Sequence, residues 1–442
     1  MKNMFYLINS PMFFEETVSE DNLPPLGQGY IATYLNKSGI SVALIDCVRD
    51  NLNAYDIVKR INTEKPSFVG INLFTQNYEI VKYIVESIST DSVLFIGGQS
   101  VKYLYHQILQ WDIANICNVI IGEGELIIPE ICKGKCIENP SVVFENKKVY
   151  KVDKNSIYFP KDISEIDLNR KVFKNELLLN HYKQKEASII TSRGCVFDCA
   201  FCGGAKSLNS DVLPRMRNKQ SIINEINELI SIYPELESIR ILDDLFLRSP
   251  KSFDAAINIF SKYNHLTWRG MAHVVSLKSS VEKLPKLHDC GCRELFIGFE
   301  SGSPRIREKI NKLGTCEDIL YVSEKVLECG IDLKGYFIFG FPGETESDFK
   351  NTLNLALQIK KISEKTKGVF RSSVFQFRPY HGTKLYDELI EQGIELSPCV
   401  PNDKINEMIG RKSFNFSSGN YSCESDEILN KYIEATQRLV EI

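Results

Sequence analysis

The stretch TSRGCVFDCAFCGG, residues 191–204, places three cysteines at C-x3-C-x2-C spacing and follows them with two glycines. Three thiols are more than one disulfide needs and fewer than the four ligands of a structural zinc site. The stretch overlaps the end of an apolar run, ASIITS (187–192), that is typical of a buried strand. The spacing therefore indicates a metal centre that lacks a fourth cysteine. A zinc loop with a remote fourth ligand and three incidental cysteines are the alternatives.

The chain around and beyond this loop alternates between strand-like and helix-like patterns. Five further apolar runs are typical of strands, and all but the last precede a helical pattern: SIRILDD (238–244), LTWRGMAHV (266–274), ELFIGFES (294–301), KGYFIFGFPGE (334–344) and VFQFRPYHGT (374–383). We therefore predict a partial or complete parallel barrel of about six β/α units. Active sites of such barrels form at the carboxyl ends of the strands, where the cysteine loop also lies.

A second alternating region precedes the barrel. Its strand-like runs are FYLI (5–8), VALID (42–46), FVGINLF (68–74), VLFIGG (93–98) and NVIIGEGE (118–125), with helical patterns such as 27–39 and 77–88 between them. Buried strands that alternate with helices predict a Rossmann-like, doubly wound parallel sheet. Ligands of such sheets bind beyond the carboxyl ends of the strands. The glycine-rich and polar segments of this region follow the strands, so we expect a second binding site there.

Together these patterns predict an α/β protein in four parts. Residues 1–136 form the Rossmann-like domain, 137–186 a connector, 187–395 the barrel, and 396–442 a short helical C-terminal extension. A chain of 442 residues is long enough for two such domains.

Composition excludes several classes of protein. The chain is 43% hydrophobic and 25% charged, as soluble globular proteins are, and its net charge of −4 without a Lys/Arg tract argues against a nucleic-acid partner. No apolar run reaches the roughly 18 residues of a membrane span, and the first residues lack the apolar core of a secretion signal. The 13 scattered cysteines then indicate a reducing compartment, so we expect a cytoplasmic protein.

The cysteine loop, with Phe201 before its last cysteine, resembles the signature of the radical SAM superfamily. The resemblance implies that Cys195, Cys199 and Cys202 ligate a [4Fe–4S] cluster and that S-adenosylmethionine (SAM) binds the remaining iron. It also implies an external electron donor of the flavodoxin or ferredoxin type. One electron then cleaves SAM to a 5′-deoxyadenosyl radical, which abstracts an unactivated hydrogen.

Other barrel segments resemble further motifs of this superfamily. The second-strand acidic pair contains Asp243, LFIGFESGSPRIREKINK (295–312) is similar to the fourth-strand motif, and GYFIFGFPGETESDF (335–349) to the fifth. His381 stands where the sixth-strand motif commonly has proline. The resemblance implies these SAM-binding residues: Phe201, Gly203, Gly204, Asp243, His273, Glu300, Ser301, Ile338, Gly340 and Phe341. Capping of the following helix is the alternative for one aspartate of the acidic pair, and a structural role is the alternative for His273.

The first region resembles the cobalamin-binding domain that precedes many radical SAM barrels. The resemblance implies that three loops contact the corrin and that glycines make room for the nucleotide tail. The implied cobalamin-binding residues are Leu26, Gly27, Gln28, Thr75, Gln76, Asn77, Gly97, Gly98, Gln99, Gly122, Glu123, Gly124 and Glu125. Proteins that ligate cobalt through histidine carry D-x-H-x-x-G, whereas Val48 stands at the histidine position here, so we expect cobalamin without a histidine ligand from this loop. A domain that has lost cobalamin is the alternative.

The implied function is that of a cobalamin-dependent radical SAM methyltransferase. It would move a methyl group from methylcobalamin to an unactivated carbon of a small-molecule or peptide substrate, such as a natural-product intermediate. A radical ring contraction or cyclisation, with or without cobalamin, is the alternative enzyme. A metal- or nucleotide-binding regulator is the alternative from another class, but the chain lacks G-x-G-x-x-G after its first strand. No general acid or base can be named from the sequence.

Overall fold

The computed structural model describes residues 4–11, 23–174, 176–396, 400–401, 416–417 and 419–440. Its contacts divide the chain into two compact units. The N-terminal unit comprises Met1–Glu176 together with two short segments from later in the chain, Ser210–Leu213 and Tyr380–Gly382. The C-terminal unit comprises the remaining residues.

The N-terminal unit is built on a seven-stranded sheet of order β2-β1-β3-β4-β5-β7-β6. Five parallel strands form its main part: β1 (Met4–Asn9), β2 (Ser41–Asp46), β3 (Phe68–Asn72), β4 (Val93–Gly97) and β5 (Cys117–Gly122). They coincide with the five runs expected to be strands. The order reverses between β1 and β3, so the carboxyl edge at these two strands is the topological switch point where such sheets bind ligands.

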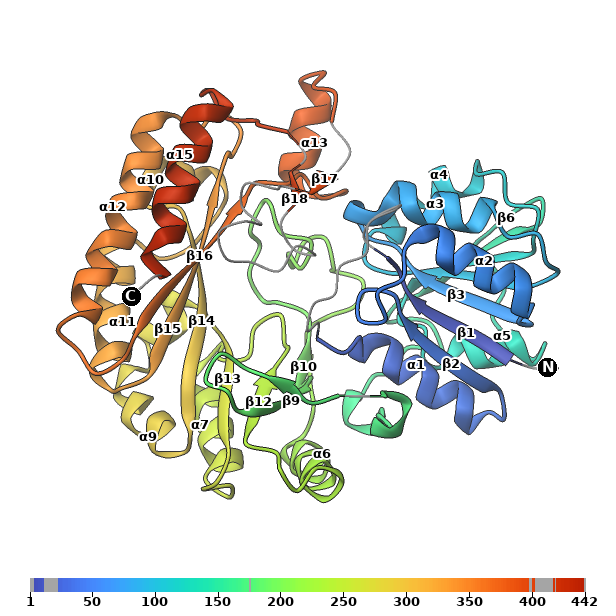
Figure 1. Cartoon of the computed structure of the whole chain (residues 1–442), viewed down its shortest axis with the longest axis horizontal. Helices are drawn as coiled ribbons and strands as arrows, with labels where there is room; N and C mark the ends of the chain where they lie inside the picture. The colour runs from blue at the N-terminus through green and yellow to red at the C-terminus, as the bar shows by residue number, and fades with distance from the viewer. Residues whose placement is uncertain are drawn as a thin grey trace. The chain divides into compact units, whose positions relative to one another are not determined.

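Helices cover both faces of this sheet, as Figure 1 shows. Helices α1 (Leu26–Lys37) and α5 (Ile127–Cys132) pack on one face, and α2 (Ala54–Glu64), α3 (Tyr78–Glu86) and α4 (Val101–Leu109) pack on the other. Most apolar residues of β1, β3, β4 and β5 are buried on both sides, which explains their nearly continuous apolar sequences, whereas the edge strand β2 is partly exposed. The predicted doubly wound parallel sheet is confirmed.

The segment expected to be a connector is divided between the two units. Strands β6 (Val142–Phe144) and β7 (Lys147–Val152) form an antiparallel hairpin, and β7 pairs in parallel with β5, so the hairpin extends the N-terminal sheet. The short helices η2 (Ile163–Glu165) and η3 (Arg170–Val172) follow it. Phe173 then packs so closely on helix α1 that a Cβ at Gly29 would lie 2.3 Å from its ring. Leu177 begins the C-terminal unit.

The C-terminal unit contains a curled sheet of order β16-β15-β14-β13-β12-β9-β8. Six parallel strands follow the predicted runs: β9 (Lys185–Ile189), β12 (Ser238–Ile241), β13 (Thr267–Ala272), β14 (Cys292–Glu300), β15 (Asp332–Phe339) and β16 (Phe370–Gln376). The two-residue strand β8 (Leu178–Leu179) pairs antiparallel with β9 at the edge. The predicted partial barrel is confirmed.

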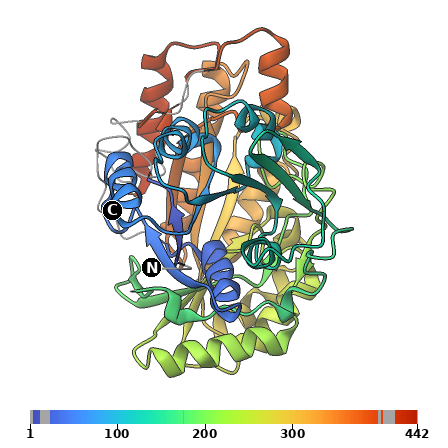
Figure 2. The ribbon, with the colours of Figure 1, turned by 90° about the vertical axis from the view of Figure 1, so that its right-hand side faces the viewer.

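Nine described α-helices belong to this unit. They are α6 (Lys219–Ile232), α7 (Pro250–Phe260), α8 (Val274–Lys278), α9 (Leu284–Asp289), α10 (Pro304–Lys309), α11 (Cys316–Glu328), α12 (Glu346–Ser363), α13 (Lys384–Glu391) and α15 (Asp426–Gln437). Most pack along one face of the curled sheet, whereas α10 and α13 pack in a smaller apolar cluster with the cysteine loop. Helix α6 lies at the β9 end of the curl and α15 at the β16 end (Figure 2). The predicted C-terminal helix is therefore α15, which packs on α12 and β16. The remainder of the predicted extension lies mostly outside the described residues.

Side chains of the curled sheet alternate between two environments. Leu333, Phe337 and Phe370 belong to the main apolar core beneath the helices and are fully buried, whereas their strand neighbours Lys334 and Tyr336 are partly exposed. Successive side chains of a strand point to opposite faces. The partly exposed set therefore lies on the face away from the core, which we call the inner face.

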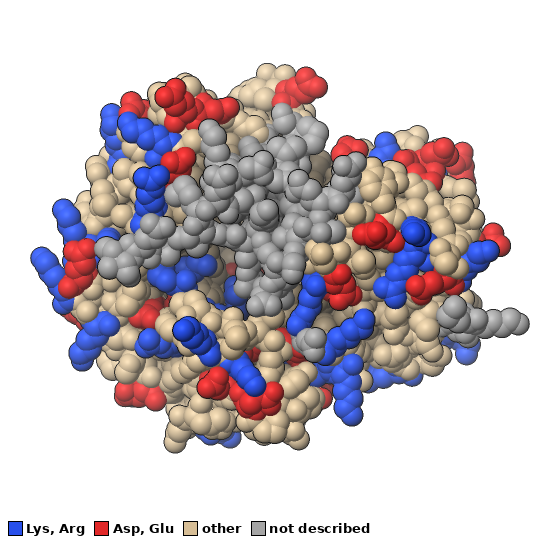
Figure 3. Space-filling model, viewed as in Figure 1, with Lys and Arg blue, Asp and Glu red and all other residues tan. Residues whose placement is uncertain are grey.

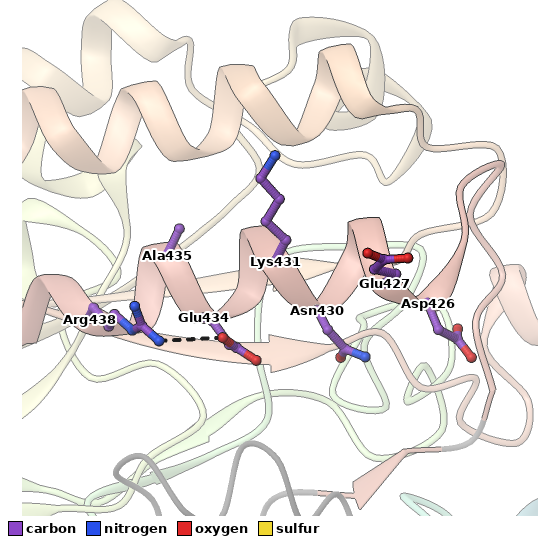
Figure 4. Close-up of a pocket in the computed structure, with 7 residues that line it drawn as sticks. All are labelled: Asp426, Glu427, Asn430, Lys431, Glu434, Ala435 and Arg438. Atoms are coloured by element: carbon purple, nitrogen blue, oxygen red, sulfur yellow. Dashed lines mark ion pairs between the residues drawn. The ribbon is translucent and has the colours of Figure 1, made fainter.

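The surface gives few indications of function. In the described part of the chain, no helix combines the length and the apolar character that a membrane span requires. On the face shown in Figure 3, acidic and basic side chains are interspersed on both units. A surface hollow on α15 is lined by alternating charges, including the Glu434–Arg438 ion pair, and contains none of the predicted site residues (Figure 4).

Candidate functional site

The three motif cysteines lie on one loop that follows β9 and the two-residue strand β10 (Ser192–Arg193). All three thiols are partly exposed. Within the loop, the amide of Cys202 donates to the carbonyl of Cys199 at 3.1 Å, and the amide of Gly204 donates to Cys202 Sγ at 3.4 Å. The loop is fastened at Ala200, whose amide donates to the carbonyl of Ile310 at 2.9 Å. The loop therefore presents three thiols from a fixed backbone.

The donor set fits a thiolate-bound iron–sulfur cluster. Burial raises the pKa of all three thiols, to about 12 for Cys202, and Lys312 lowers each of them. Among the described residues, no three His, Cys, Asp or Glu side chains are grouped to hold a single metal ion. Thiolates that each bind a different iron of one cluster do not have to meet at one point. A cluster bound here would carry its negative charge beside the Lys312 ammonium group.

The two aspartates of the second-strand pair have different surroundings. Asp243 is buried and accepts four hydrogen bonds, from the amides and hydroxyls of Thr191 and Ser192, at 2.5–3.0 Å. It thus fastens the start of the cysteine loop to β12. Asp244 is exposed and accepts from the amide of Gly194 at 3.0 Å. Of the two, Asp244 is the one with a surface that a ligand can reach, although the sequence pointed to Asp243.

His273 caps a helix beside the cysteine loop. Its Nδ1 accepts from the amide of Val275 at 3.2 Å at the start of α8, and its ring stacks on Phe197 with centroids 3.9 Å apart. Burial, with Lys312 next, lowers the pKa of His273 to about 3, so the imidazole is neutral and its proton is on Nε2. Among the described residues, Nε2 is buried without a hydrogen-bond partner. These contacts support a structural role for His273, which was the alternative to SAM binding.

Glu300 ends β14 in an uncommon conformation. Its φ of +62° is in the left-handed region, and the pairing of β14 with β15 shifts between Gly298 and Glu300. Its Oε1 accepts from Lys312 Nζ at 2.9 Å, and both side chains are buried. A non-glycine residue with positive φ stores strain and is enriched at functional sites.

Lys312 and Arg307 are residues of this site that the sequence analysis did not select. Arg307 is buried and donates to the carbonyls of Phe299, Ser301 and Gly314 at 2.6–3.0 Å, so it holds the segment between β14 and α11. Both residues lie within or next to the fourth-strand motif, but no spacing rule distinguishes them from the other basic residues there. Only the tertiary structure shows that the Lys312 ammonium group lies close enough to the three cysteines to affect their pKa.

Ser301 does not face the same space as Glu300. Its side chain is fully buried, and its Oγ lies 3.1 Å from Thr352 Oγ1 on α12. The amide of Ser303 also donates to Ser301 Oγ at 3.1 Å. The hydroxyl therefore joins β14 to α12, and the predicted pair of Glu300 and Ser301 is split between the two faces of the sheet.

The fifth-strand motif is shaped by a buried carboxyl group. Glu344 Oε2 accepts from the amides of Gly340 and Phe341 at 2.7 and 2.9 Å, which fixes the turn after β15. Burial raises the pKa of Glu344 to about 8. Phe341 contacts Phe201 of the cysteine loop edge to face at 5.6 Å, and Ile338 packs in the same apolar cluster. The structure thus brings Phe201, Ile338 and Phe341 together.

Polar side chains connect the ends of three adjacent strands in the N-terminal unit. Asn9 Nδ2 donates to Asp46 Oδ1, and Asn72 Nδ2 donates to Asn9 Oδ1, both at 2.8 Å. The amide of Ser10 donates to Asn72 Oδ1 at the same distance. This chain of hydrogen bonds holds the carboxyl edge of β2, β1 and β3, where the cobalamin-binding loops were predicted.

The predicted cobalamin-binding residues differ in how accessible they are. Gly27, Gly98, Gln99 and Gly122 are exposed, and a Cβ at Gly27 would have no atom within 4 Å. Gly97, Glu123, Thr75 and Gln76 are partly exposed. Leu26, Gln28, Asn77, Gly124 and Glu125 are buried. Of the exposed glycines, Gly27 faces open space, whereas a Cβ at Gly98 or Gly122 would lie 2.4 Å or 2.2 Å from a backbone oxygen of the unit itself.

Two of the buried residues have structural contacts. Gln28 Nε2 donates to the carbonyl of Ile8 at 2.7 Å, and Asn77 Oδ1 accepts from the amide of Phe74 at 2.7 Å. They shape the loops instead of presenting their amides at the edge. Val48 is also buried, so the position of the missing histidine lies inside the fold.

Thr75 contacts a segment that is distant in sequence. Its Oγ1 lies 3.0 Å from His381 Nδ1 and 3.2 Å from Ser100 Oγ, and it accepts from the amide of His381 at 3.3 Å. Burial lowers the pKa of His381 to about 4, so the ring is neutral. A Cβ at Gly382 would lie 2.3 Å from Tyr103, so glycine permits this close packing. The turn with histidine in place of proline is therefore part of the N-terminal unit.

The cysteines of the C-terminal unit outside the motif differ in their exposure. Cys290 and Cys292 are buried, Cys316 and Cys329 are partly exposed, and Cys423 is exposed. Cys423 is exposed because it lies in a bend before α15 and not in an element of the core. Cys399 lies outside the described residues.

Comparison with known proteins identifies both parts of the chain. The model of the B12 binding domain matches residues 17–132, and that of the radical SAM superfamily matches residues 189–356. An uncharacterised methyltransferase of Pyrococcus horikoshii is 28% identical over 85% of this chain and 80% of its own length. The cytidylyl-2-hydroxyethylphosphonate methyltransferase of Streptomyces wedmorensis is 23% identical over 84% and 78%, respectively.

Solved structures share the fold. The methyltransferase TsrM of Kitasatospora setae, with cobalamin and a [4Fe–4S] cluster bound, has a TM-score of 0.66 at 16% identity over 100% of this chain and 91% of its own. The cobalamin-dependent SAM radical enzyme OxsB has a TM-score of 0.67 at 15% identity, over 95% of this chain and 64% of its own. The matched models, the relatives and the shared fold place this chain in the family of cobalamin-dependent radical SAM methyltransferases, whose cofactors are a [4Fe–4S] cluster, SAM and cobalamin.

Proposed function

We propose that the enzyme transfers a methyl group to an unactivated carbon of a small-molecule or peptide substrate, such as a natural-product intermediate. The observation that carries the proposal is the presence, in one chain, of a three-thiol loop and of a second, glycine-lined edge that suits a corrin. Two relatives whose names identify them as methyltransferases match most of the chain. A solved structure of TsrM contains tryptophan as its substrate, which supports a small-molecule substrate here.

When bound, the cluster and SAM supply a radical that removes hydrogen, and cobalamin supplies the methyl group. The chain has to hold these groups and keep water away from the radical. Cys195, Cys199 and Cys202 would hold the cluster, and Lys312 would balance its charge. Glu300, held by Lys312, and Phe201 would contact SAM, and the fully buried Phe341 would support Phe201 from behind.

The remaining predicted residues have narrower roles in this proposal. Gly203 and Gly204 would allow the backbone to approach SAM, because glycine has no Cβ. Ile338 would form the apolar side of the same space, and the buried Gly340 would support the turn after it. Asp243, His273 and Ser301 act indirectly by fixing the loop, helix α8 and β14.

In the N-terminal unit, Gly27, Gly97, Gly98, Gln99 and Gly122 would line the corrin, with Thr75, Gln76 and Glu123 beside them. Leu26, Gln28, Asn77, Gly124 and Glu125 would support these loops from below. Cobalt would receive no histidine from the loop after β2, because Val48 occupies that position. A flavodoxin or ferredoxin type of protein would supply the electron.

The test combines cofactor content with product analysis. Full-length protein is purified without oxygen from cells supplied with hydroxocobalamin, and corrin is quantified as the dicyano form beside iron and sulfide. We expect about one corrin and about four irons per chain. Methyl transfer must then form S-adenosylhomocysteine in step with 5′-deoxyadenosine. Formation of 5′-deoxyadenosine alone in the presence of a converted substrate would contradict methyl transfer and support a ring contraction or cyclisation.

A further inference from the structure

The inner face of the curled sheet carries a cluster of charged side chains away from the cysteine loop. Its cations are Arg240 on β12, Arg269 on β13, Lys334 on β15 and Arg371 on β16, and its carboxylates are Glu186 on β9 and Glu294 on β14. The register brings them close, because Arg240 pairs with Arg269, Arg269 with Glu294, and Lys334 with Arg371. Four cations thus face two carboxylates.

Both carboxylates are already bound by arginines. Arg269 donates to Glu186 through Nε at 2.7 Å and through Nη2 at 2.5 Å, and to Glu294 through Nη1 at 3.0 Å. Arg371 Nε donates to Glu294 Oε1 at 3.0 Å. Burial would raise the pKa of Glu294, but Arg371 and Arg269 outweigh it and hold the pKa below its usual value. The two arginines therefore already compensate the charges of both carboxylates.

Lys334 is the cation that these carboxylates do not neutralise. In the part of the chain that the structure describes, its Nζ makes no hydrogen bond and no ion pair, and it lies 5.3 Å from the ring centroid of Tyr336. Arg240 lies 5.3 Å from the ring centroid of Phe296 on the same face. Burial, followed by the charge of Arg371, lowers the pKa of Lys334 to about 7. A poorly solvated ammonium group without a counter-ion is costly, and an anion would relieve that cost.

The other titratable groups around Lys334 do not supply this anion. Asp332 accepts from Tyr182 Oη at 2.5 Å and lies 3.6 Å from Arg293. Burial lowers the pKa of His181 to about 4, so it is neutral, and burial raises the pKa of Tyr336, so that phenol is neutral too. The local charge therefore remains positive. Since Lys334, Tyr336, Arg240 and Arg371 are all partly exposed, the cations are accessible from the inner face.

We propose that the inner face binds an anionic group of the substrate, a carboxylate, phosphate or phosphonate, with Lys334 as its direct partner and Arg240 and Arg371 beside it. This inference rests on the proposed function in one respect, namely that the anion belongs to the substrate of the methyl transfer. Oxygen anions are the partners that ammonium and guanidinium groups bind most strongly. The inner face would thus hold the anionic end of the substrate within the barrel. The reacting end of the substrate would then point towards the carboxyl ends of the strands, where the active sites of such barrels form.

The test uses inorganic phosphate as the probe and the anaerobically reconstituted full-length enzyme. Lysines are reductively methylated at pH 7, with and without phosphate, and the modification of each lysine is measured by peptide mass spectrometry. We expect Lys334 to react readily because much of it is uncharged at this pH, and phosphate to slow its modification about tenfold or more. Lys361, which is exposed on α12, is the internal control and should not be protected.

A calorimetric titration with phosphate gives an independent measurement. Lys334→Met should weaken binding about tenfold or more, Lys334→Arg should retain most of it, and Lys361→Met should bind as the wild type does. Equal modification of Lys334 with and without phosphate, in a correctly folded protein, would overturn the proposal.

The outcome is separate from that for the proposed function, because neither measurement needs turnover. An enzyme that transfers methyl groups but does not bind phosphate at Lys334 would overturn the anion site alone. An enzyme that binds phosphate there but releases no S-adenosylhomocysteine with any substrate would leave the site intact and contradict the methyl transfer.

Discussion

Lys312 Nζ lies 2.9 Å from Glu300 Oε1, and the two side chains cross directly over Gly298 at the end of β14. A Cβ at Gly298 would lie 2.1 Å from Glu300 Oε1 and 3.0 Å from Lys312 Nζ, so a larger residue there would displace the ends of these two side chains. The positive φ of Glu300 and the shifted register of β14 accompany this arrangement. Because Lys312 also acts on the pKa of the three motif thiols, the pair connects the fourth strand to the cysteine loop.

Removing one member of this pair should destabilise the C-terminal unit. Lys312→Met leaves the Glu300 carboxylate buried without its counter-ion, and such changes cost about 3–5 kcal/mol. Chemical unfolding of the full-length protein measures this loss. The double variant Glu300→Gln/Lys312→Met should recover part of it, because no charge is then left buried. A double variant as unstable as the sum of the single variants would show that the two residues do not interact.

Cys199→Ala should abolish 5′-deoxyadenosine formation and lower the iron content. Two thiolates cannot hold a cluster that needs three protein ligands. Cys329→Ala is the matched control, because Cys329 is a partly exposed thiol outside the loop, and it should retain about four irons per chain. The measurement is chromatography of the SAM cleavage products together with an iron assay. SAM cleavage by the Cys199→Ala variant at the wild-type rate would contradict the assignment of the loop.

Gly27→Trp should prevent cobalamin from binding while leaving the fold intact. A Cβ at Gly27 meets nothing within 4 Å, so an indole there would fill the open space at the carboxyl edge without displacing protein atoms. Asn36→Trp, which is exposed near the other end of the same helix, is the control. Corrin content after anaerobic purification should fall to background only in Gly27→Trp. Normal corrin content in that variant would place the cofactor elsewhere.

Glu344→Gln should make the stability of the protein less dependent on pH. The folded pKa of Glu344 is raised to about 8, above the value of an unfolded glutamate, so its contribution is complete below pH 4.5 and is lost as pH rises to 8. A glutamine oxygen can accept from the amides of Gly340 and Phe341 at any pH. The variant should therefore gain stability relative to the wild type at pH 8, on the order of 1–4 kcal/mol.

Urea unfolding at pH 5.5 and pH 8 tests this expectation. Glu364→Gln is a suitable control, since Glu364 is exposed, and its stability should follow that of the wild type at both pH values. A difference between Glu344→Gln and the wild type that does not change with pH would mean that Glu344 is ionised throughout this range.

Much of the fold was predictable because buried parallel strands require continuous apolar runs. The five runs of the N-terminal unit and the six of the barrel all became strands. The hairpin β6–β7 was recognisable as a hairpin, but its place in the sheet was not. That place depends on the parallel pairing of β7 with β5, a contact between distant segments that leaves no periodic signal.

The sequence by itself determined the chemistry of the cysteine loop, because three thiols at C-x3-C-x2-C spacing are close together in any fold. It also determined the order of the two domains and the glycines at the strand ends. Tertiary structure decided which polar residues are available to contact a ligand. In the folded chain Ser301 contacts Thr352, and both carboxylate oxygens of Asp243 accept hydrogen bonds from Thr191 and Ser192. The fold also brings Lys312 close enough to the thiols to lower their pKa. Availability depends on contacts between residues that are far apart in sequence, and local patterns do not encode such contacts.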